Sequence, residues 1–399
     1  MFRHVAALML AIAASVGLAY GGPNDGPEEA RVTVFLDALR ADAQRRGITP
    51  ATFAAAFANF TPDPRIIAAT RKEPEYGKPV GAYVDSIVSR PQVAAGAAQA
   101  ARQASLLDAI EKKYGVERWI ILALWGIESS YGNAHDRWDV IRSLATLAQA
   151  RYRDPYFRDE LLVALRILQE GHIARDRMLG SWAGAMGQPQ FMPSSFYDYA
   201  VDFSGDGRRD IWTNVPDVLA SIGNYMARCG WQPGLPWGFE VVLPKSFDHR
   251  RSRASFAEWT ALGLRRADGG VFPRAGEGFL LFPSGAAGPA FLVTANFAVI
   301  KRYNNSDTYA LAVGHLADRM RGGGPFRAAW PQADPQLSRD ARMALQHKMA
   351  GLGYKIGDFA GRLDFDQRDA IRDLQVKFGM VPDGHPTPAL LARLGIDVR

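Results

Sequence analysis

The chain has 399 residues, of which 48% are hydrophobic and 22% are charged. This length exceeds one ordinary hydrophobic core, and the composition excludes a disordered chain, so we expect a globular protein with two domains. The net charge of +6 suits a polyanionic partner such as nucleic acid, anionic lipid or the bacterial cell wall. Because there is no dense run of Lys and Arg, nucleic acid is the weakest of these candidates.

The N-terminus has the pattern of a secretory signal peptide. Arg3 precedes an apolar stretch over residues 5–18, which small residues follow. This pattern predicts a cleaved signal peptide over residues 1–21. The apolar run is shorter than a full bilayer span, which disfavours an uncleaved anchor. The only cysteine is Cys229, so neither an intrachain disulfide nor a lipid attached after the apolar run is expected.

Helical spacing dominates from residue 31 to about residue 226. The segments "RVTVFLDALRADAQRRG" and "DELLVALRILQEGHI" place apolar residues on one face and charges on the other. Gly47 and Gly171 stand where these two helices are expected to end. The first three-fifths of the chain are therefore predicted to be mainly helical.

After residue 226 the residue pattern changes twice. Residues 234–303 contain the runs "GFEVVLP", "GFLLFPS" and "AFLVTANFAVIKRY" between Gly and Pro residues, which predicts a small β-containing insert. A further helix follows in "DTYALAVGHLADRMRGG". Residues 323–336 are rich in Gly and Pro and predict an interdomain linker. The amphipathic segments of residues 337–397 predict a compact helical module.

One acidic residue stands in an apolar stretch, "ILALWGIESSYGN", over residues 121–133. On a helix, the neighbours of this Glu128 include Trp125 and Tyr131 and no basic residue. Apolar surroundings favour the neutral form of a carboxyl group, which can then donate a proton to a leaving oxygen. A structural ion pair with a distant Arg is the alternative, and spacing alone leaves both open.

A second candidate stretch is "GSWAGAMGQPQFMPSSFYDYA", residues 180–200. Ser181 and Gln190 offer neutral hydrogen-bonding groups, and Phe191 offers a flat apolar face. Neutral polar groups beside aromatic rings suit a carbohydrate better than a phosphate. The alternative is a Gly/Pro loop in which Ser194 caps the next helix.

The segment "DFSGDGRRDIWTNVPD", residues 202–217, resembles the first half of an EF-hand loop. Asp202, Ser204 and Asp206 alternate as oxygen ligands do in that motif, although its twelfth position is a threonine here. Asp210 or Asp217 could close the site. A metal would be structural in this loop, and an Asp-rich turn without metal is the alternative.

Several of these motifs together resemble a known family. The segments "IESSYGN", "AGAMGQPQFMPSS", "DFSGDGRRDIW", "IGNYM" and "NFAVIKRYNNSDTYALAV" resemble, in this order, the B-type lytic murein transglycosylases of glycoside hydrolase family 103. The tail segments "LQHKMAGLGY" and "GRLDFDQRDAIRDLQ" are similar to a three-helix peptidoglycan-binding module. The resemblance implies a mainly α protein: a lysozyme-like helical catalytic core with the β-containing insert over residues 29–322, followed by this module over residues 337–397.

The resemblance also assigns site residues. It implies that Glu128 is the single catalytic acid. The implied substrate-binding residues are Ser181, Gln190, Phe191, Tyr225, Tyr303, Asn304, Tyr309, Tyr83 and Tyr156. The implied metal ligands are Asp202, Ser204, Asp206, the backbone carbonyl of Arg208, and Asp217, which closes the loop one residue later than in one form of it. The metal would be a structural Ca²⁺, and the chemistry would need no cofactor.

The implied activity is cleavage of the β-1,4 bond between N-acetylmuramic acid and N-acetylglucosamine, with formation of 1,6-anhydromuramic acid ends. Glu128 would act first as acid and then as base, and the N-acetyl group of the substrate would replace a second carboxylate. The expected partner is the peptidoglycan glycan strand, with no nucleic acid and no stable membrane anchor. Without a lipid-attachment cysteine, the protein is expected to be periplasmic rather than a lipoprotein.

Two alternatives remain open at this point. A hydrolytic muramidase would use water and a second carboxylate, for which Asp136, Asp154 and Asp176 are candidates. A non-catalytic cell-wall-binding protein would keep the tail module and use Glu128 only structurally.

Overall fold

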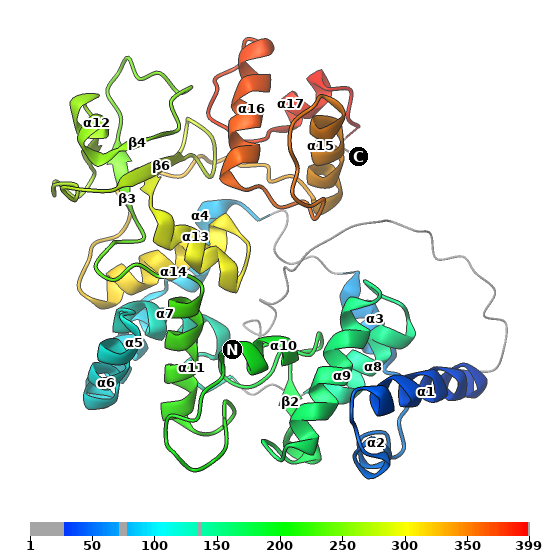
Figure 1. The fold of residues 1–399 in the computed structure, drawn as a ribbon. Coiled ribbons are helices and arrows are strands. Elements are labelled where there is room, and N and C mark those ends of the chain that lie inside the picture. Colours follow the sequence, from blue (N-terminus) through cyan, green and yellow to red (C-terminus); the bar gives the residue numbers. More distant parts are fainter. Residues whose placement is uncertain (1–27, 72–77, 135–137, 398–399) are drawn as a thin grey trace.

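The computed structural model describes residues 28–71, 78–134 and 138–397 (Figure 1). The predicted signal peptide, residues 1–21, lies outside the described residues. Among the described helices, none combines the length and the apolar character that a membrane span needs.

Helices make up most of the described chain. They are α1 (Glu28–Arg45), α2 (Pro50–Ala56), α3 (Pro64–Thr70), α4 (Val80–Ile87), α5 (Arg90–Arg102), α6 (Ala104–Tyr114), α7 (Arg118–Ser129), α8 (Val140–Gln149), α9 (Tyr156–Gln169), α10 (Pro193–Tyr199), α11 (Val215–Arg228), α12 (Phe256–Ala261), α13 (Ala295–Tyr303), α14 (Asp307–Met320), α15 (Arg339–Gly351), α16 (Phe365–Lys377) and α17 (Pro388–Arg393).

The strands form two antiparallel sheets. They are β1 (Trp138–Asp139), β2 (Leu179–Gly180), β3 (Gly238–Val242), β4 (Arg253–Ser255), β5 (Arg265–Arg266), β6 (Glu277–Leu281) and β7 (Ala290–Val293). β1 pairs with β2, and the other five form one sheet in the order β4-β6-β7-β3-β5. This larger sheet is the β-containing part of the predicted insert. It ends at Val293, because the Thr294 side chain accepts a hydrogen bond from the Asn296 N–H and starts α13.

The hydrophobic core of the larger, N-terminal part of the chain is built around α7. Every residue of this helix from Ile120 to Ser129 is buried, because its apolar residues occur all around the helix rather than on one stripe. α14, α5 and α11 pack against it, and these helices gather on one side of the molecule in Figure 1. A second group, formed by α1, α2, α3, α8 and α9, lies beside them. The mainly α, lysozyme-like fold expected from the sequence is therefore confirmed.

The predicted linker, residues 323–336, has no helix or strand, yet it is packed against the rest of the protein. The Trp330 ring lies on the main hydrophobic core. Asp334 is buried, and its carboxylate accepts hydrogen bonds from the Val80 N–H at 2.9 Å and the Ser284 hydroxyl at 2.8 Å. The segment thus fixes the orientation of the module instead of acting as a loose tether.

The C-terminal module has its own small core and is docked on the larger sheet. The Phe365 ring of α16 stacks on Phe279 of β6 with centroids 4.0 Å apart. The buried Arg372 guanidinium donates to the Leu280 carbonyl at 2.8 Å. An aromatic stack and a buried charged donor both need defined partners, so this docking is specific.

Candidate active site

Glu128 lies in the last turn of α7, and its side chain is nearly buried, with 9% exposure. The helix ends because Ser130, Tyr131 and Gly132 all have positive φ, at 51°, 59° and 78°. Left-handed conformation is unfavourable for residues other than glycine and is held by the surrounding structure, often at functional sites. The predicted position of the acid on an apolar helix is therefore confirmed, at a sharply turned helix end.

One hydrogen-bond partner of the Glu128 carboxyl group comes from α14. The Tyr309 hydroxyl donates to Oε1 of Glu128, and the Tyr309 side chain is 1% exposed. Burial raises the pKa of Tyr309 well above its usual range, and the neighbouring Glu128 carboxyl raises it further. The phenol therefore remains a donor at any physiological pH. Tyr309, predicted as a substrate contact, lies against the acid and orients it.

Gln188 forms hydrogen bonds that fix the position of α7 near Glu128. Its side-chain oxygen accepts from the Trp125 indole at 2.8 Å, and its amide nitrogen donates to the Trp212 carbonyl at 2.8 Å. A Cβ atom on Gly132 would lie 2.6 Å from this oxygen, so only glycine fits at that position. Both ends of the Gln188 amide are thus occupied in joining α7 to the segment that precedes α11.

Three of the predicted substrate residues form one aromatic cluster. The Phe191, Tyr225 and Tyr303 rings have centroids 4.7 to 5.9 Å apart. The Tyr225 hydroxyl donates to the Arg302 carbonyl at 2.5 Å, and the Tyr303 hydroxyl donates to the Pro189 carbonyl at 2.6 Å. These bonds fix the rings, because a buried phenol needs a partner.

Three polar predicted residues lie in the segments that carry this cluster. The Ser181 hydroxyl accepts from the Ala185 N–H at 3.1 Å, and the Gln190 amide donates to the Gly187 carbonyl at 2.8 Å. Asn304 is buried and directly follows α13. Two short antiparallel bridges fold residues 180–191 back on themselves. The structure thus brings together residues from three separate motifs.

Tyr83 and Tyr156 are the last two predicted substrate residues. Tyr83 is buried on α4, and its phenol contributes to the raised pKa of Tyr309, so it lies near the acid. Tyr156 begins α9, and its buried hydroxyl has no hydrogen-bond partner among the described residues. Burial raises the pKa of Tyr156 well above its usual range, and Glu160 raises it further, whereas Arg153 and Arg362 oppose the shift. The Arg362 guanidinium, from the C-terminal module, is thus among the charges that act on this phenol.

Two of the acids considered for a hydrolytic mechanism are exposed. Asp154 is exposed and pairs with Arg151 at 3.1 Å, and Asp176 is exposed. Asp136 lies outside the described residues.

A buried carboxyl group that the sequence analysis missed is Glu160 of α9. It is 4% exposed and accepts from the Ser194 hydroxyl at 2.6 Å and the Ser194 N–H at 2.8 Å. Burial raises its pKa. Glu160 interrupts the apolar face of α9 just as Glu128 interrupts α7. The signal that could have found it is therefore the same one, an acidic residue at an otherwise apolar helix position. The Glu160 partner Ser194 lies inside the first turn of α10, so the alternative that Ser194 caps this helix is wrong: Met192 precedes the helix, and no side chain caps it.

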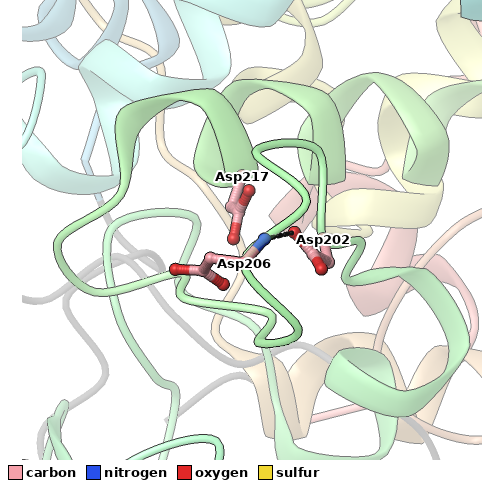
Figure 2. A group of neighbouring side chains, drawn as sticks. All are labelled: Asp202, Asp206 and Asp217. Carbon is pink, nitrogen blue, oxygen red and sulfur yellow. Dashed lines mark hydrogen bonds between the residues drawn. The ribbon is translucent and has the colours of Figure 1, made fainter.

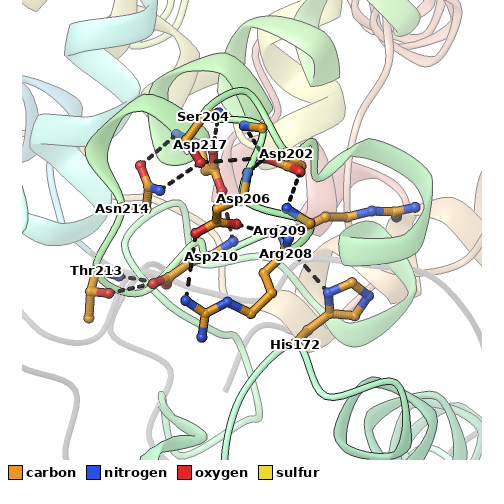
Figure 3. A network of polar contacts seen from close by, with 12 residues as sticks. His172, Asp202, Ser204, Asp206, Arg208, Arg209, Asp210, Thr213, Asn214 and Asp217 are labelled. Atoms are coloured by element: carbon orange, nitrogen blue, oxygen red, sulfur yellow. Dashed lines mark hydrogen bonds and ion pairs between the residues drawn. The ribbon is translucent and has the colours of Figure 1, made fainter.

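The acidic loop brings together three of its predicted metal ligands (Figure 2). Asp202, Asp206 and Asp217 each offer an oxygen, and these three atoms lie within 4.8 Å of one another. Asp217 is fully buried, and its carboxylate accepts from the Phe203 N–H at 2.9 Å. Asp210 instead accepts from backbone N–H groups that follow it, at 2.8 and 2.9 Å (Figure 3). Of the two acids proposed to close the loop, Asp217 is the one whose oxygen lies with those of Asp202 and Asp206.

The remaining predicted ligands flank this cluster (Figure 3). The Ser204 hydroxyl lies 3.4 Å from an Asp202 oxygen, and the Arg208 N–H donates to Asp206 at 2.9 Å. Burial opposes ionisation of Asp202, but backbone N–H groups of residues 205–207 hold its pKa below the usual value. Three carboxylates so close repel one another unless a cation lies between them, and hard oxygen donors suit Ca²⁺. The residues present therefore fit a calcium ion.

Comparison with known proteins gives the family. Residues 32–318 match the family described as Transglycosylase SLT domain, and residues 338–394 match Putative peptidoglycan binding domain. The chain belongs to the SLT transglycosylase family. Its resemblance to B-type lytic transglycosylases with a C-terminal peptidoglycan-binding module is thereby confirmed.

Relatives with known names support this assignment. The membrane-bound lytic murein transglycosylase B of Escherichia coli strain K12 is 34% identical over 214 residues, which span 52% of this chain and 58% of that protein. This chain therefore matches little more than half the length of that relative. The crystal structure of SltB3 from Pseudomonas aeruginosa, in complex with NAG-anhNAM-pentapeptide, is 44% identical and covers 91% of this chain and 99% of its own, with a TM-score of 0.82. The Escherichia coli Slt35 structure in complex with calcium shares the fold at 24% identity, with a TM-score of 0.61, over 73% of this chain and 92% of that one.

Proposed function

We propose that the protein is a periplasmic lytic transglycosylase that cleaves the β-1,4 bond between N-acetylmuramic acid and N-acetylglucosamine in peptidoglycan. The observation that carries this proposal is the nearly buried Glu128, whose carboxyl group is held by the neutral phenol of Tyr309. SltB3, which was crystallised with NAG-NAM-pentapeptide, supports the substrate class. The N-terminal signal pattern supports the periplasmic location.

In the first step Glu128 protonates the glycosidic oxygen, and the bond to C1 of the muramoyl sugar breaks. The N-acetyl group of that sugar stabilises the positive charge at C1, so a second carboxylate is not required. In the second step the ionised Glu128 removes the proton of the C6 hydroxyl, whose oxygen attacks C1. The product is a 1,6-anhydro ring, no water is consumed, and Glu128 recovers its proton.

Tyr309 makes this double role easier. A phenol can donate to an oxygen of the ionised carboxylate and to the carbonyl oxygen of the neutral acid. The partner of Glu128 therefore accepts both protonation states during one turnover. An arginine in the same place would favour the anion alone.

The other predicted site residues are proposed to hold the sugar and the loop. Phe191, Tyr225 and Tyr303 would form an apolar wall, with Ser181, Gln190 and Asn304 beside it and with Tyr83 and Tyr156 further along the glycan. Asp202, Ser204, Asp206, Asp217 and the Arg208 carbonyl would bind Ca²⁺. Calcium in this loop would stabilise the fold and take no part in the chemistry.

Product analysis tests the proposal. Digests of purified peptidoglycan should yield muropeptides with 1,6-anhydromuramic acid ends, one water lighter than hydrolysis products and inert to borohydride. An internal hydroxyl competes well with free water, because an intramolecular reaction avoids the entropy cost of recruiting a second molecule. Mass spectrometry before and after borohydride treatment separates the two outcomes. Reducible ends would show a hydrolytic muramidase, and no cleavage would favour a wall-binding protein.

A further inference from the structure

A wide groove lies on the outer side of the β-containing insert. It runs between α12, the short strand β5 and the loop of residues 269–274 that leads to β6. We call it the insert groove. Its free volume is about 820 Å³, which is within the range of roughly 300–1,000 Å³ that is typical of binding pockets. In Figure 1, α12 lies at the edge of the molecule, far from α8 and α9.

The larger sheet separates the insert groove from the candidate active site. Alternate residues of β7 belong to two different cores, because successive side chains of a strand point to opposite faces. Phe291 and Val293 pack in the main core, which contains α7, whereas Ala290 and Leu292 pack in a second core of the insert. Phe256 of α12 lines the groove and belongs to the second core. A partner in the groove would therefore leave the candidate active site uncovered.

The apolar side chains of the insert groove are unusually exposed. Val271 is 85% exposed and Val242 is 48% exposed. Phe272 is only partly buried against the insert core. Apolar surface is stabilised by removal from water, and a contiguous exposed patch of it marks an interaction site. The gathering of these side chains in one concave groove indicates a surface that a partner covers.

The insert groove also carries positive charge. Arg265, Arg266 and Arg274 line it, and no acidic side chain does so within the described part of the chain. Arg266 is already occupied, because it forms an ion pair with Asp268 and its guanidinium carbon lies 4.4 Å from the centroid of the Phe239 ring. Arg265 and Arg274 are exposed, and neither pairs with an acidic side chain among the described residues. The groove thus presents two available arginines beside its apolar surface.

These two properties together select the chemistry of the partner. Apolar surface attracts apolar side chains, and unpaired arginines attract carboxylates. A glycan strand instead needs neutral hydrogen-bonding side chains, and Thr260 is the only one among the described lining residues. A lipid bilayer cannot enter a concave groove. We propose that the insert groove docks an exposed segment of another protein, in which apolar side chains stand next to aspartate or glutamate.

The first experiment selects peptides without assuming their sequence. A phage-displayed library of random peptides is passed over the immobilised full chain, after removal of phages that bind the Arg265→Glu/Arg274→Glu double variant. We expect the recovered peptides to be rich in Asp and Glu beside Leu, Ile, Val or Phe, because only such segments match both properties of the groove. Recovery of no peptide, or of peptides without acidic residues, would refute the proposal.

The affinity of a recovered peptide then locates its binding site. By fluorescence anisotropy, Arg265→Glu and Arg274→Glu should each raise the Kd by at least about tenfold, because like charges then meet across the interface. Val271→Ser should also raise it. Arg251→Glu makes the same charge change at an exposed residue of the insert that does not line the groove, so it should retain the wild-type Kd. An equal loss of affinity in this control would overturn the proposal.

A second measurement uses the wild-type chain alone, so it does not depend on how a variant folds. Replacement of Asp and Glu in the peptide by Asn and Gln should weaken binding, and so should replacement of its apolar residues by Ser. An unchanged Kd after either replacement would contradict the proposed chemistry of the partner.

Two other occupants of the insert groove are tested with the same double variant. If wild type binds phosphatidylglycerol vesicles and the variant does not, the surface is a membrane contact. If wild type dimerises and the variant does not, the occupant is a second copy of the chain. Either result would overturn the proposal. The variant should release anhydro ends from a soluble glycan as wild type does, because the groove is separate from the active site, so docking and the proposed function can fail independently.

Discussion

Two buried carboxyl groups with different surroundings show opposite uses of the same chemistry, and one of them, Asp307, stands only two residues before the tyrosine that holds the other. Glu128 is held by Tyr309, a neutral phenol, while Asp307 lies between Lys301 and Arg368. Burial would raise the pKa of Asp307, but the two cations hold it far below its usual range. Asp307 is thus a permanent anion that joins the module to the catalytic region. Tyr309 carries no charge, so its hydrogen bond leaves Glu128 able to give and take a proton.

The strongest test of this contrast is Glu128→Gln. We expect the release of anhydromuropeptides to fall by at least 10²–10⁴-fold, because that is the usual contribution of one general acid, and Glu128 acts twice. The melting temperature should change little, since Gln has the same shape and can still accept from Tyr309. Asp154→Asn, at an exposed acid, is the control and should retain full activity. Near-native turnover of the Gln variant would remove Glu128 from the mechanism.

Asp307→Asn should act on stability instead. It leaves Lys301 and Arg368 buried without their shared anion, which costs about 3–5 kcal/mol in the free energy of unfolding. Urea unfolding measures this loss. Asp366→Asn breaks an exposed contact with Arg253 at 3.6 Å and should cost at most about 1 kcal/mol.

The contribution of Asp307 to the free energy of unfolding depends on pH in a defined direction. The folded-state pKa of Asp307 lies below its unfolded value of about 3.9. Its stabilising contribution is therefore complete above the unfolded pKa and is lost as the pH falls through the folded pKa. Below about pH 4 the wild-type and Asp307→Asn proteins should converge in stability. An equal difference between them at pH 7 and at pH 2 would contradict the ion-pair account.

The carboxylates of the acidic loop, Asp202, Asp206 and Asp217, are a third case. Here a bound cation, rather than a phenol or a basic side chain, would balance their charge. Calcium at 100 times its dissociation constant should stabilise the protein by about 2.7 kcal/mol. The melting temperature should rise with calcium and fall with a chelator, and Asp206→Ala should abolish the shift. Asp248→Ala changes an exposed acid of the insert and should keep it. Identical melting curves with calcium and with chelator would exclude the site.

The smallest expected effect concerns the partner of the acid. Tyr309→Phe removes the hydroxyl that orients Glu128, so we expect kcat to fall about tenfold, which corresponds to about 1.4 kcal/mol. Tyr197→Phe is a matched control, because the Tyr197 hydroxyl donates to Glu170 on the surface in the same kind of bond. If both variants lose the same activity, the loss does not come from the orientation of Glu128.

Local spacing in the sequence determined much of this protein. The apolar residues around Glu128 in the sequence predict its place on a buried helix. The alternation of Asp202, Ser204 and Asp206 predicts a tight acidic loop. The β-containing insert and the helical module also follow from local patterns. Such features depend on residues within one or two turns of one another, so a single sequence expresses them directly.

Only the tertiary structure decided which distant groups meet. Tyr309 reaches Glu128 across 181 positions of the chain, and nothing in its local pattern separates an orienting phenol from a sugar contact. The choice of Asp217 over Asp210 depends on how α11 packs beneath the loop. The linker, which composition alone predicts to be loose, is fixed by the hydrogen bonds of Asp334. Long-range contacts follow from packing of whole elements, and spacing along the chain does not encode them.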